Sequence, residues 1–345
     1  MQQVLCFGEI LLRMSPEPGW PDNPLLKTYV GGAEVNVALA LANWAVPVSV
    51  GTAMPANFMA DEIRRYLIAA GVLTDKIIQR GSRIGTYYLH QGADLKSAGA
   101  IYDRAYSAFA ELKPEDLDLD SYLEGISHLH LTAISPAVSA SAAAVCQALV
   151  EAAAKKNIQI SLDLNYRSKL WKYAKTPLEV IPALAEYAHT IMGNIWAANQ
   201  MLGTPVDPAA EHTTDPNELA KYAADSSAAV MEAFPTCKLV ANTFRFSEND
   251  EQVKYFATVY TAGQRRLYTS AQQVYSAIVD RAGSGDCFMA GLLYGSLKNY
   301  EEQKMVDFAT AAATGKFYEM GDHTRQTLSS IEQRMKKQSL IQKSL

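Results

Sequence analysis

The stretch Val279-Asp280-Arg281-Ala282-Gly283-Ser284-Gly285-Asp286-Cys287-Phe288 decides how the rest of the chain is interpreted. An apolar run at 274–279 leads into it and predicts a buried strand, and apolar residues at helical spacing continue after it to Leu293. The small residues 283–285 therefore stand where a helix begins. Free backbone N–H groups and the helix dipole favour an anion at such a place, and glycine lets the anion approach closely.

Asp286 falls in the first turn of that helix, beside any anion bound there. A carboxylate in this place repels a phosphate in the ground state, which is unfavourable in a simple anion site. It suits a base that takes a proton from an attacking hydroxyl group. The alternative is a plain strand-to-helix turn in which Asp286 only caps the helix.

Composition limits the classes of protein to consider. The chain has 345 residues, 49% of them hydrophobic, and a formal net charge of -5. That length is ample for one large domain, and the mild negative charge predicts neither a nucleic-acid surface nor an anionic-membrane surface. Four scattered cysteines without a Cys-x-x-Cys pair predict free thiols in a reducing cytoplasm. No signal peptide is evident at the N-terminus, and the Ala-rich stretch 137–154 is interrupted by polar residues, which disfavours a membrane span.

Apolar runs alternate with helical patterns along the chain. Strands or helices are expected at 4–7, 31–44, 46–50, 61–71, 158–164, 239–245 and 253–260. This alternation predicts an α/β fold with a mostly parallel sheet and helices on both faces. At 84–109 two strands around the loop 92–99 predict a hairpin outside the main sheet. Together with 12–31 this segment is expected to form a small β lid, inserted in a single domain that spans 1–345.

A second glycine motif, Gly31-Gly32-Ala33-Glu34-Val35-Asn36, opens the helix expected at 31–44. By itself it predicts either a plain turn or a backbone that approaches a ligand. Together with the first stretch it resembles the ribokinase-like (phosphofructokinase-B type) carbohydrate kinases, which carry Gly-Gly-x-x-x-Asn and Asp-Thr-x-Gly-Ala-Gly-Asp in these places. This chain departs from the latter pattern at Arg281 and Ser284. The resemblance implies that Asp286 is the catalytic base.

In that family the glycine turn forms the anion hole, a role that would fall to Gly283, Ser284 and Gly285. Four further stretches narrow the resemblance to the 2-keto-3-deoxygluconate kinases: Tyr102–Arg104 with Ser107-Ala108, His128–Ser135, Asp163–Arg167 and Gly321-Asp322-His323. Carried over by position, the resemblance implies that the sugar acid is held by Gly32, Asn36, Tyr88 and Tyr102, and its C1 carboxylate by Arg104 and Arg167. Two arginines suit a sugar acid better than a neutral sugar.

The resemblance also implies ATP and Mg²⁺ as cofactors, with Asn194, Arg245, Gly283 and Gly285 on the nucleotide side. The family usually shows Asn-x-x-Glu at 194–197, and its Glu organises magnesium-bound water; this chain has Ala197 instead. No protein ligand to a metal is therefore predicted. His128 and His130 share a face of a strand, but without a third ligand they are interpreted as buried or capping histidines rather than a metal pair.

The sequence thus predicts a cytoplasmic homo-oligomer that phosphorylates the terminal hydroxyl of 2-keto-3-deoxygluconate or a close analogue, using ATP. Within enzymes, the alternative is a kinase of the fructokinase or ribokinase type that acts on another sugar. From another class, the alternative is a sugar-acid-binding protein with weak or no turnover. The change at Ala197 favours that binder, whereas the intact turn at 283–286 opposes it.

Overall fold

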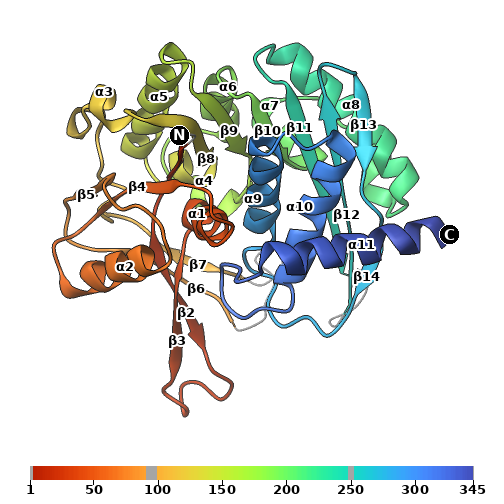
Figure 1. Ribbon diagram of the computed structural model, residues 1–345. Helices are drawn as coiled ribbons and strands as arrows, with labels where there is room; N and C mark the ends of the chain where they lie inside the picture. Colours follow the sequence, from red (N-terminus) through yellow and green to blue (C-terminus); the bar gives the residue numbers. More distant parts are fainter. Residues whose placement is uncertain (1–2, 91–98, 248–251, 345) are drawn as a thin grey trace.

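The computed structural model describes residues 3–90, 99–247 and 252–344 (Figure 1). The strands of its main sheet are β1 (Gln3–Phe7), β4 (Val48–Met54), β5 (Ile77–Gln79), β8 (Ile126–Thr132), β9 (Gln159–Asp163), β10 (Thr190–Gly193), β11 (Leu239–Ser247), β12 (Val253–Thr261), β13 (Arg266–Thr269) and β14 (Gln273–Tyr275). They lie in the order β13-β12-β11-β10-β9-β8-β1-β4-β5, with β14 beside β12. The neighbours from β11 to β5 are parallel, and the pairs that β12 makes are antiparallel.

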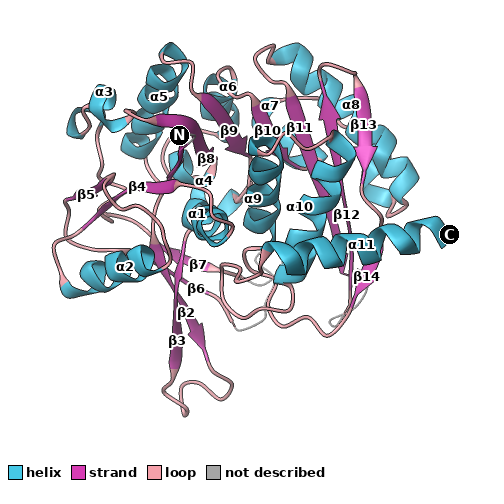
Figure 2. Cartoon of the chain, in the orientation of Figure 1, coloured by secondary structure: helices cyan, strands magenta, loops and turns pink. Residues whose placement is uncertain are grey.

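Helices cover both faces of this sheet, as Figure 2 shows. They are α1 (Ala33–Asn43), α2 (Phe58–Ala69), α3 (Leu119–Tyr122), α4 (Ile134–Ala137), α5 (Ala140–Lys155), α6 (Pro177–Ala185), α7 (Ile195–Leu202), α8 (Pro216–Ala233), α9 (Ser284–Leu297), α10 (Glu302–Lys316) and α11 (Leu328–Ser344). Among the described residues no helix is long and apolar enough to cross a membrane. The predicted α/β class is confirmed.

Strand β1 shows why the sheet needs cover on both sides. Val4 and Cys6 belong to the core that includes α1, α9 and α10, whereas Leu5 and Phe7 belong to the core that includes α5 and α6. All four side chains are fully buried. Side chains alternate between the two faces of a strand, so a continuous apolar run can be buried only between two helical layers.

A second, smaller sheet stands apart from the main one, and β2 and β3 project from the body of the molecule (Figure 1). Its strands are β2 (Leu11–Pro16), β3 (Leu26–Gly31), β6 (Gly85–Tyr88) and β7 (Ile101–Asp103), in the order β3-β2-β6-β7. These strands fall in the segments predicted for the lid, and β6 and β7 pair antiparallel as the predicted hairpin requires. Residues 92–98 of its predicted loop lie outside the described residues.

One predicted strand is wrong. The run 274–279 was expected to be a buried strand, but β14 ends at Tyr275 and pairs only beside the sheet's antiparallel strand β12. Val274 is 50% exposed and Val279 is 39% exposed. Beyond β14 the backbone N–H groups of Val279 and Asp280 donate to the carbonyl oxygen of Phe317, which lies outside the sheet.

The cysteines are free and buried, as their scattered positions predict. Cys6 lies in β1, Cys146 in α5, Cys287 in α9, and Cys237 just before β11. Burial raises the pKa of each thiol, to about 12 for Cys237. A protonated, buried thiol is a poor nucleophile and packs as a small apolar group.

Candidate active site

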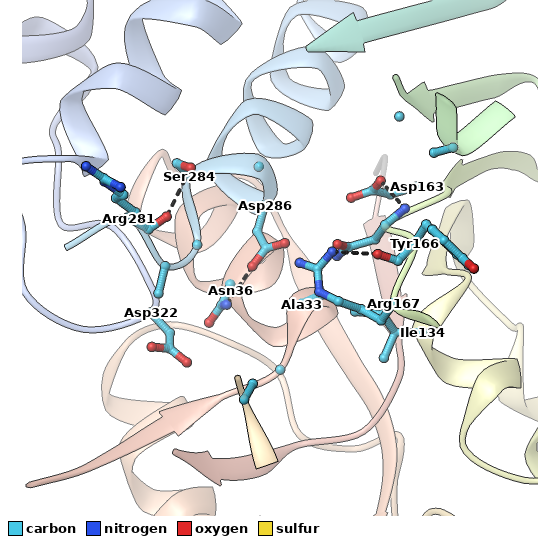
Figure 3. Close-up of a pocket in the computed structure, with 18 of the residues that line it drawn as sticks. Ala33, Asn36, Ile134, Asp163, Tyr166, Arg167, Arg281, Ser284, Asp286 and Asp322 are labelled. Carbon is cyan, nitrogen blue, oxygen red and sulfur yellow. Dashed lines mark hydrogen bonds between the residues drawn. The ribbon is translucent and has the colours of Figure 1, made fainter. Parts of the chain in front are cut away.

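A cavity of about 520 Å³ opens between the carboxyl ends of the parallel strands, the small sheet and the start of α9 (Figure 3). Ligands bind at this edge of open parallel sheets. The sequence-predicted residues that line it are Gly32, Asn36, Tyr102, Arg104, Arg167, Asn194, Arg245, Gly283, Ser284, Gly285 and Asp286. The structure therefore brings these residues, predicted from separate motifs, to one place.

The glycine turn has a conformation that only glycine adopts easily. Gly283 has φ 75°, and a Cβ there would lie 1.6 Å from the carbonyl oxygen of Asp322. Helix α9 starts at the next residue, Ser284. The first N–H groups of a helix have no partner inside the helix, so this turn directs donors toward the cavity.

Asp286 lies in the first turn of α9 and faces the cavity (Figure 3). Its Oδ2 accepts a hydrogen bond of 2.7 Å from Nδ2 of Asn36, which α1 supplies. Burial raises the pKa of Asp286 to about 8, the Asn36 hydrogen bond opposes this shift, and the nearby carboxylate of Asp163 adds to it. A carboxyl group with such a pKa can exchange a proton near neutral pH, as a general base must.

Glu34 and Asp163 also line the cavity, and neither was assigned a role from the sequence. Glu34 Oε1 accepts hydrogen bonds from the Thr132 backbone N–H at 3.1 Å and from the hydroxyls of Thr132 and Ser135, both at 2.7 Å. Burial raises the pKa of Asp163 to about 7, and its Oδ1 accepts from the Asn165 backbone N–H. Glu34 lies in the Gly31–Asn36 motif and Asp163 in the Asp163–Arg167 motif. The sequence did not show that the two carboxylates line the same cavity.

The two predicted carboxylate-binding arginines differ in their surroundings. Arg104 is buried, and its Nε lies 2.5 Å from Oε2 of Glu9, so a protein carboxylate already offsets its charge. Arg167 is half-buried and also lines the cavity, and its Nη1 donates to the backbone carbonyl of Tyr166 at 2.9 Å. Among the described ion pairs none involves Arg167. Arg167 nevertheless lies near enough to Asp163 and Asp286 for its charge to lower the pKa of both carboxyl groups.

Tyr88 does not line the cavity; it is 38% exposed. Its neighbour Tyr87 is buried, lines the cavity, and stacks on Tyr102 with ring centroids 6.2 Å apart. Alternate residues of a strand point to opposite faces, so only one of two adjacent tyrosines on β6 can face the cavity. That residue is Tyr87, which was not predicted, and Tyr88 lies outside the cavity.

On the nucleotide side, Asn194 caps α7: its Oδ1 accepts from the backbone N–H of Ala197 at 2.8 Å. Ala197 lines the cavity and is 5% exposed. Nη1 of Arg245 lies 3.4 Å from Oγ of Ser284, which places a cation at the glycine turn. Arg281 also lines the cavity. Cationic side chains and helix N–H groups together fit the phosphates of a nucleotide.

The histidines give no sign of a metal centre. His130 is fully buried, its Nδ1 lies 3.0 Å from Ser161 Oγ, and burial lowers its pKa to about 3. Within the described ranges no three His, Cys, Asp or Glu side chains are placed to hold a metal ion. Any Mg²⁺ at this site would thus take most of its oxygen ligands from phosphates and water, which that ion tolerates well.

Comparisons with known proteins agree with this geometry. The family described as pfkB family carbohydrate kinase matches residues 1–322. A 2-dehydro-3-deoxygalactonokinase from Haloferax volcanii is 29% identical over 171 residues, which cover 49% of this chain and 54% of that relative, so the match spans about half its length.

Solved structures extend the similarity to nearly the whole chain. A 2-dehydro-3-deoxygluconokinase from Thermotoga maritima superposes with a TM-score of 0.87 at 30% identity, covering 97% of this chain and 100% of that one. A PfkB family carbohydrate kinase from Listeria grayi gives a TM-score of 0.84 at 30% identity, with the same coverage. The predicted phosphotransferase class is confirmed by these relatives. The family match across residues 1–322, with a buried carboxyl group and a glycine turn at the start of one helix, leads to one conclusion: the chain belongs to the pfkB family of carbohydrate kinases.

Proposed function

We propose that this protein uses ATP to phosphorylate the terminal hydroxyl of 2-keto-3-deoxygluconate or a close sugar acid. The observation that carries the proposal is Asp286, which faces the cavity from the start of α9 beside Gly283 and Gly285. Transfer of a phosphoryl group to a hydroxyl needs a base and an anion-stabilising group next to each other. The relatives named for sugar-acid substrates support the choice of acceptor.

Each part of the cavity has its own role in phosphoryl transfer. Asp286 accepts the proton of the attacking hydroxyl, and its hydrogen bond to Asn36 fixes the orientation of the carboxylate. The N–H groups at Gly283–Gly285 stabilise the negative charge that develops on the phosphoryl group. Tyr87 is buried and Tyr102 is half-buried, and both line the cavity from the strands of the lid sheet. There they exclude water from the sugar side.

The nucleotide side fits ATP because Arg245 and Arg281 line the cavity beside the turn. When bound, ATP supplies the phosphoryl group, and Mg²⁺ neutralises part of the charge on its phosphates. Ala197 offers no oxygen to magnesium-bound water, and Asn194 uses its side-chain oxygen to cap α7. The residues present thus fit the nucleotide well and the metal ion only through phosphates and water.

The sugar-acid specificity rests on Arg167. Its guanidinium lines the cavity and contacts a backbone carbonyl rather than a protein carboxylate, so it can form a bidentate pair with a ligand carboxylate. Lys169 lines the same wall and adds a second positive charge. Arg104 contributes its buried stem and any donors that the pair with Glu9 leaves available.

The test is a coupled ADP-release assay with Mg·ATP over matched pairs of sugar acids and neutral sugars. We expect turnover with 2-keto-3-deoxygluconate or a near analogue at a kcat/KM at least tenfold above that for the corresponding neutral sugar. Turnover of fructose or ribose in preference would identify a kinase for another sugar. Calorimetric binding of sugar acids without ADP release would identify a binding protein and refute the proposal.

A further inference from the structure

A buried charged cluster joins the lid sheet to the glycine turn, and the mechanism above uses none of its charged residues. Arg13 lies on lid strand β2 and is 1% exposed. Its Nη2 lies 2.7 Å from Oδ2 of Asp280, and its Nη1 lies 2.8 Å from Oδ1 of Asp322. The ring of Tyr29, on β3, covers the guanidinium at 4.3 Å. We call Arg13, Asp280 and Asp322, with Tyr87, the Arg13 cluster.

Asp280 shapes the turn through its carboxylate, and Asp322 does so through its backbone carbonyl. Asp280 Oδ1 accepts a hydrogen bond from the Ala282 backbone N–H at 3.0 Å, and its Oδ2 accepts from the Gly321 N–H at 3.2 Å. The carbonyl of Asp322 lies so close to Gly283 that no Cβ fits between them. The backbone that enters α9 is thus fixed from two sides, by Asp280 in front and by residues 321–322 beside it.

The cluster also reaches the substrate wall of the cavity. The hydroxyl of Tyr87 donates to Asp322 Oδ2 at 2.6 Å, and the ring of Tyr87 stacks on Tyr102. Both tyrosines line the cavity. An unbroken path of contacts therefore runs from the lid residues that face the sugar to the turn that faces the phosphoryl group.

The cluster holds one guanidinium and two carboxylates, all of them buried. Asp280 and Asp322 are buried to 0% and 2% exposure, and the only positive charge in an ion pair with them in the described residues is Arg13. Lys316 is buried nearby, and its Nζ donates to the carbonyl of Glu319. Removing one partner of a buried ion pair leaves an uncompensated charge, which strongly favours rearrangement of the surrounding backbone.

We propose that Arg13 is a positioning residue for phosphoryl transfer: from the lid sheet it holds Asp280 and Asp322, and through them the Gly283–Asp286 turn. The inference deepens the proposed function, because that turn is the proposed site of transfer. A misplacement of about 1 Å at a reacting group lowers the rate by on the order of 10²-fold, so loss of this restraint lowers kcat more than it weakens substrate binding.

The single variant Arg13→Met leaves two buried carboxylates facing each other and destabilises the fold. The double variant Arg13→Met/Asp322→Asn removes one charge of each sign, so it keeps the balance while removing the restraint. Tyr87→Phe removes only the hydroxyl that reaches Asp322 and keeps the ring. Arg83→Met is the matched control: Arg83 forms a lid ion pair with Asp103, away from the turn.

The first measurement is amide hydrogen exchange of the full, unliganded chain. We expect exchange at residues 281–287 to rise at least tenfold in the double variant, to rise less in Tyr87→Phe, and to stay at the wild-type rate in Arg83→Met, with β8 protected in every variant. Unchanged exchange at 281–287 in a folded double variant overturns the inference. Equal loss of protection throughout the molecule also overturns it, because that result assigns Arg13 to general stability.

The second measurement is the split between kcat and KM with a sugar acid and Mg·ATP. We expect the double variant to lose on the order of 10²-fold in kcat with a KM near that of the wild type. A wild-type kcat in the double variant overturns the inference. Hydrogen exchange needs no substrate, so a wild-type protein that turns over no sugar acid refutes the proposed function and leaves the exchange result to decide on Arg13.

Discussion

The two walls of the cavity hold their charges in different ways (Figure 3). On the turn wall, residues 280–286 with 321–322, the carboxylates of Asp280 and Asp322 share Arg13 and are buried. On the arginine wall, Arg167 is half-buried and meets only a backbone carbonyl among the described hydrogen bonds. Charges that already have full partners keep the backbone in place. Charges with spare donors or acceptors are the ones that can bind a ligand.

Asp286 is the carboxylate on the turn wall that faces the cavity and can accept a further hydrogen bond. Its substitution has the largest expected effect. Asp286→Asn should lower kcat by on the order of 10²–10⁴-fold, because the amide cannot accept the hydroxyl proton. Steady-state kinetics with a sugar acid measure this. Asp61→Asn is the control, since Asp61 occupies the first turn of α2 but is exposed. Near wild-type turnover of Asp286→Asn would show that this residue is not the base.

The arginine wall gives the next effect. Arg167→Met should raise KM for a sugar acid about 10- to 100-fold, since a hydrogen bond to a charged group contributes roughly 1.5–3 kcal/mol. Activity on a neutral sugar should change little. Titration of both substrates for both proteins measures the difference, and an equal loss on the acid and the neutral sugar would assign Arg167 a structural role.

Arg104, like Arg13 at the turn wall, is paired with a buried carboxylate, so its substitution should affect stability more than substrate binding. Arg104→Met leaves the buried carboxylate of Glu9 without its ion pair, so its main effect should be a lower Tm. The double variant Arg104→Met/Glu9→Gln should recover most of that Tm. If the double variant is stable and still shows a KM for the sugar acid raised as far as in Arg167→Met, both arginines hold the carboxylate.

The pH dependence follows from the raised pKa of Asp286, about 8. Only the ionised carboxylate acts as a base, so kcat/KM should rise with pH up to about 8 and fall about tenfold per unit below it. Folding favours the protonated carboxyl, since the folded pKa lies above the unfolded value. The contribution of Asp286 to the free energy of unfolding should therefore decrease as pH rises toward 8. Asp286→Asn should make the dependence shallower and leave the share of Asp163, whose folded pKa is about 7. A rate that is flat from pH 6 to 9 would contradict the assignment.

The smallest effect concerns the metal ion. Ala197→Glu places a carboxylate at the cavity beside Asn194, where it can order water on Mg²⁺. We expect the Mg²⁺ concentration for half-maximal rate to fall several-fold at fixed ATP. Ala197→Gln controls for side-chain size. Equal half-saturation in the parent and the Glu variant would show that another acidic group already supplies this charge.

The sequence predicted the motifs whose meaning is local. The helix expected at 31–44, the helix beginning at residues 283–285, and the alternation of strands and helices all follow from patterns a few residues long, and the structure has α1 from Ala33 and α9 from Ser284. Contacts across the chain could not be predicted in this way: Arg13 and Asp280 are 267 positions apart, and Glu9 and Arg104 are 95 apart. Tyr88 lies outside the cavity because the alternation of a short strand does not tell which set of side chains faces inward.

The four buried cysteines make the chain its own unfolding reporter. They lie in β1, α5, the approach to β11, and α9, so each belongs to a different element of the main body. A small alkylating reagent reacts with an accessible thiolate and hardly with a buried thiol. The order in which the reagent labels Cys6, Cys146, Cys237 and Cys287 under mild denaturant would therefore record which element opens first. No engineered cysteine is needed.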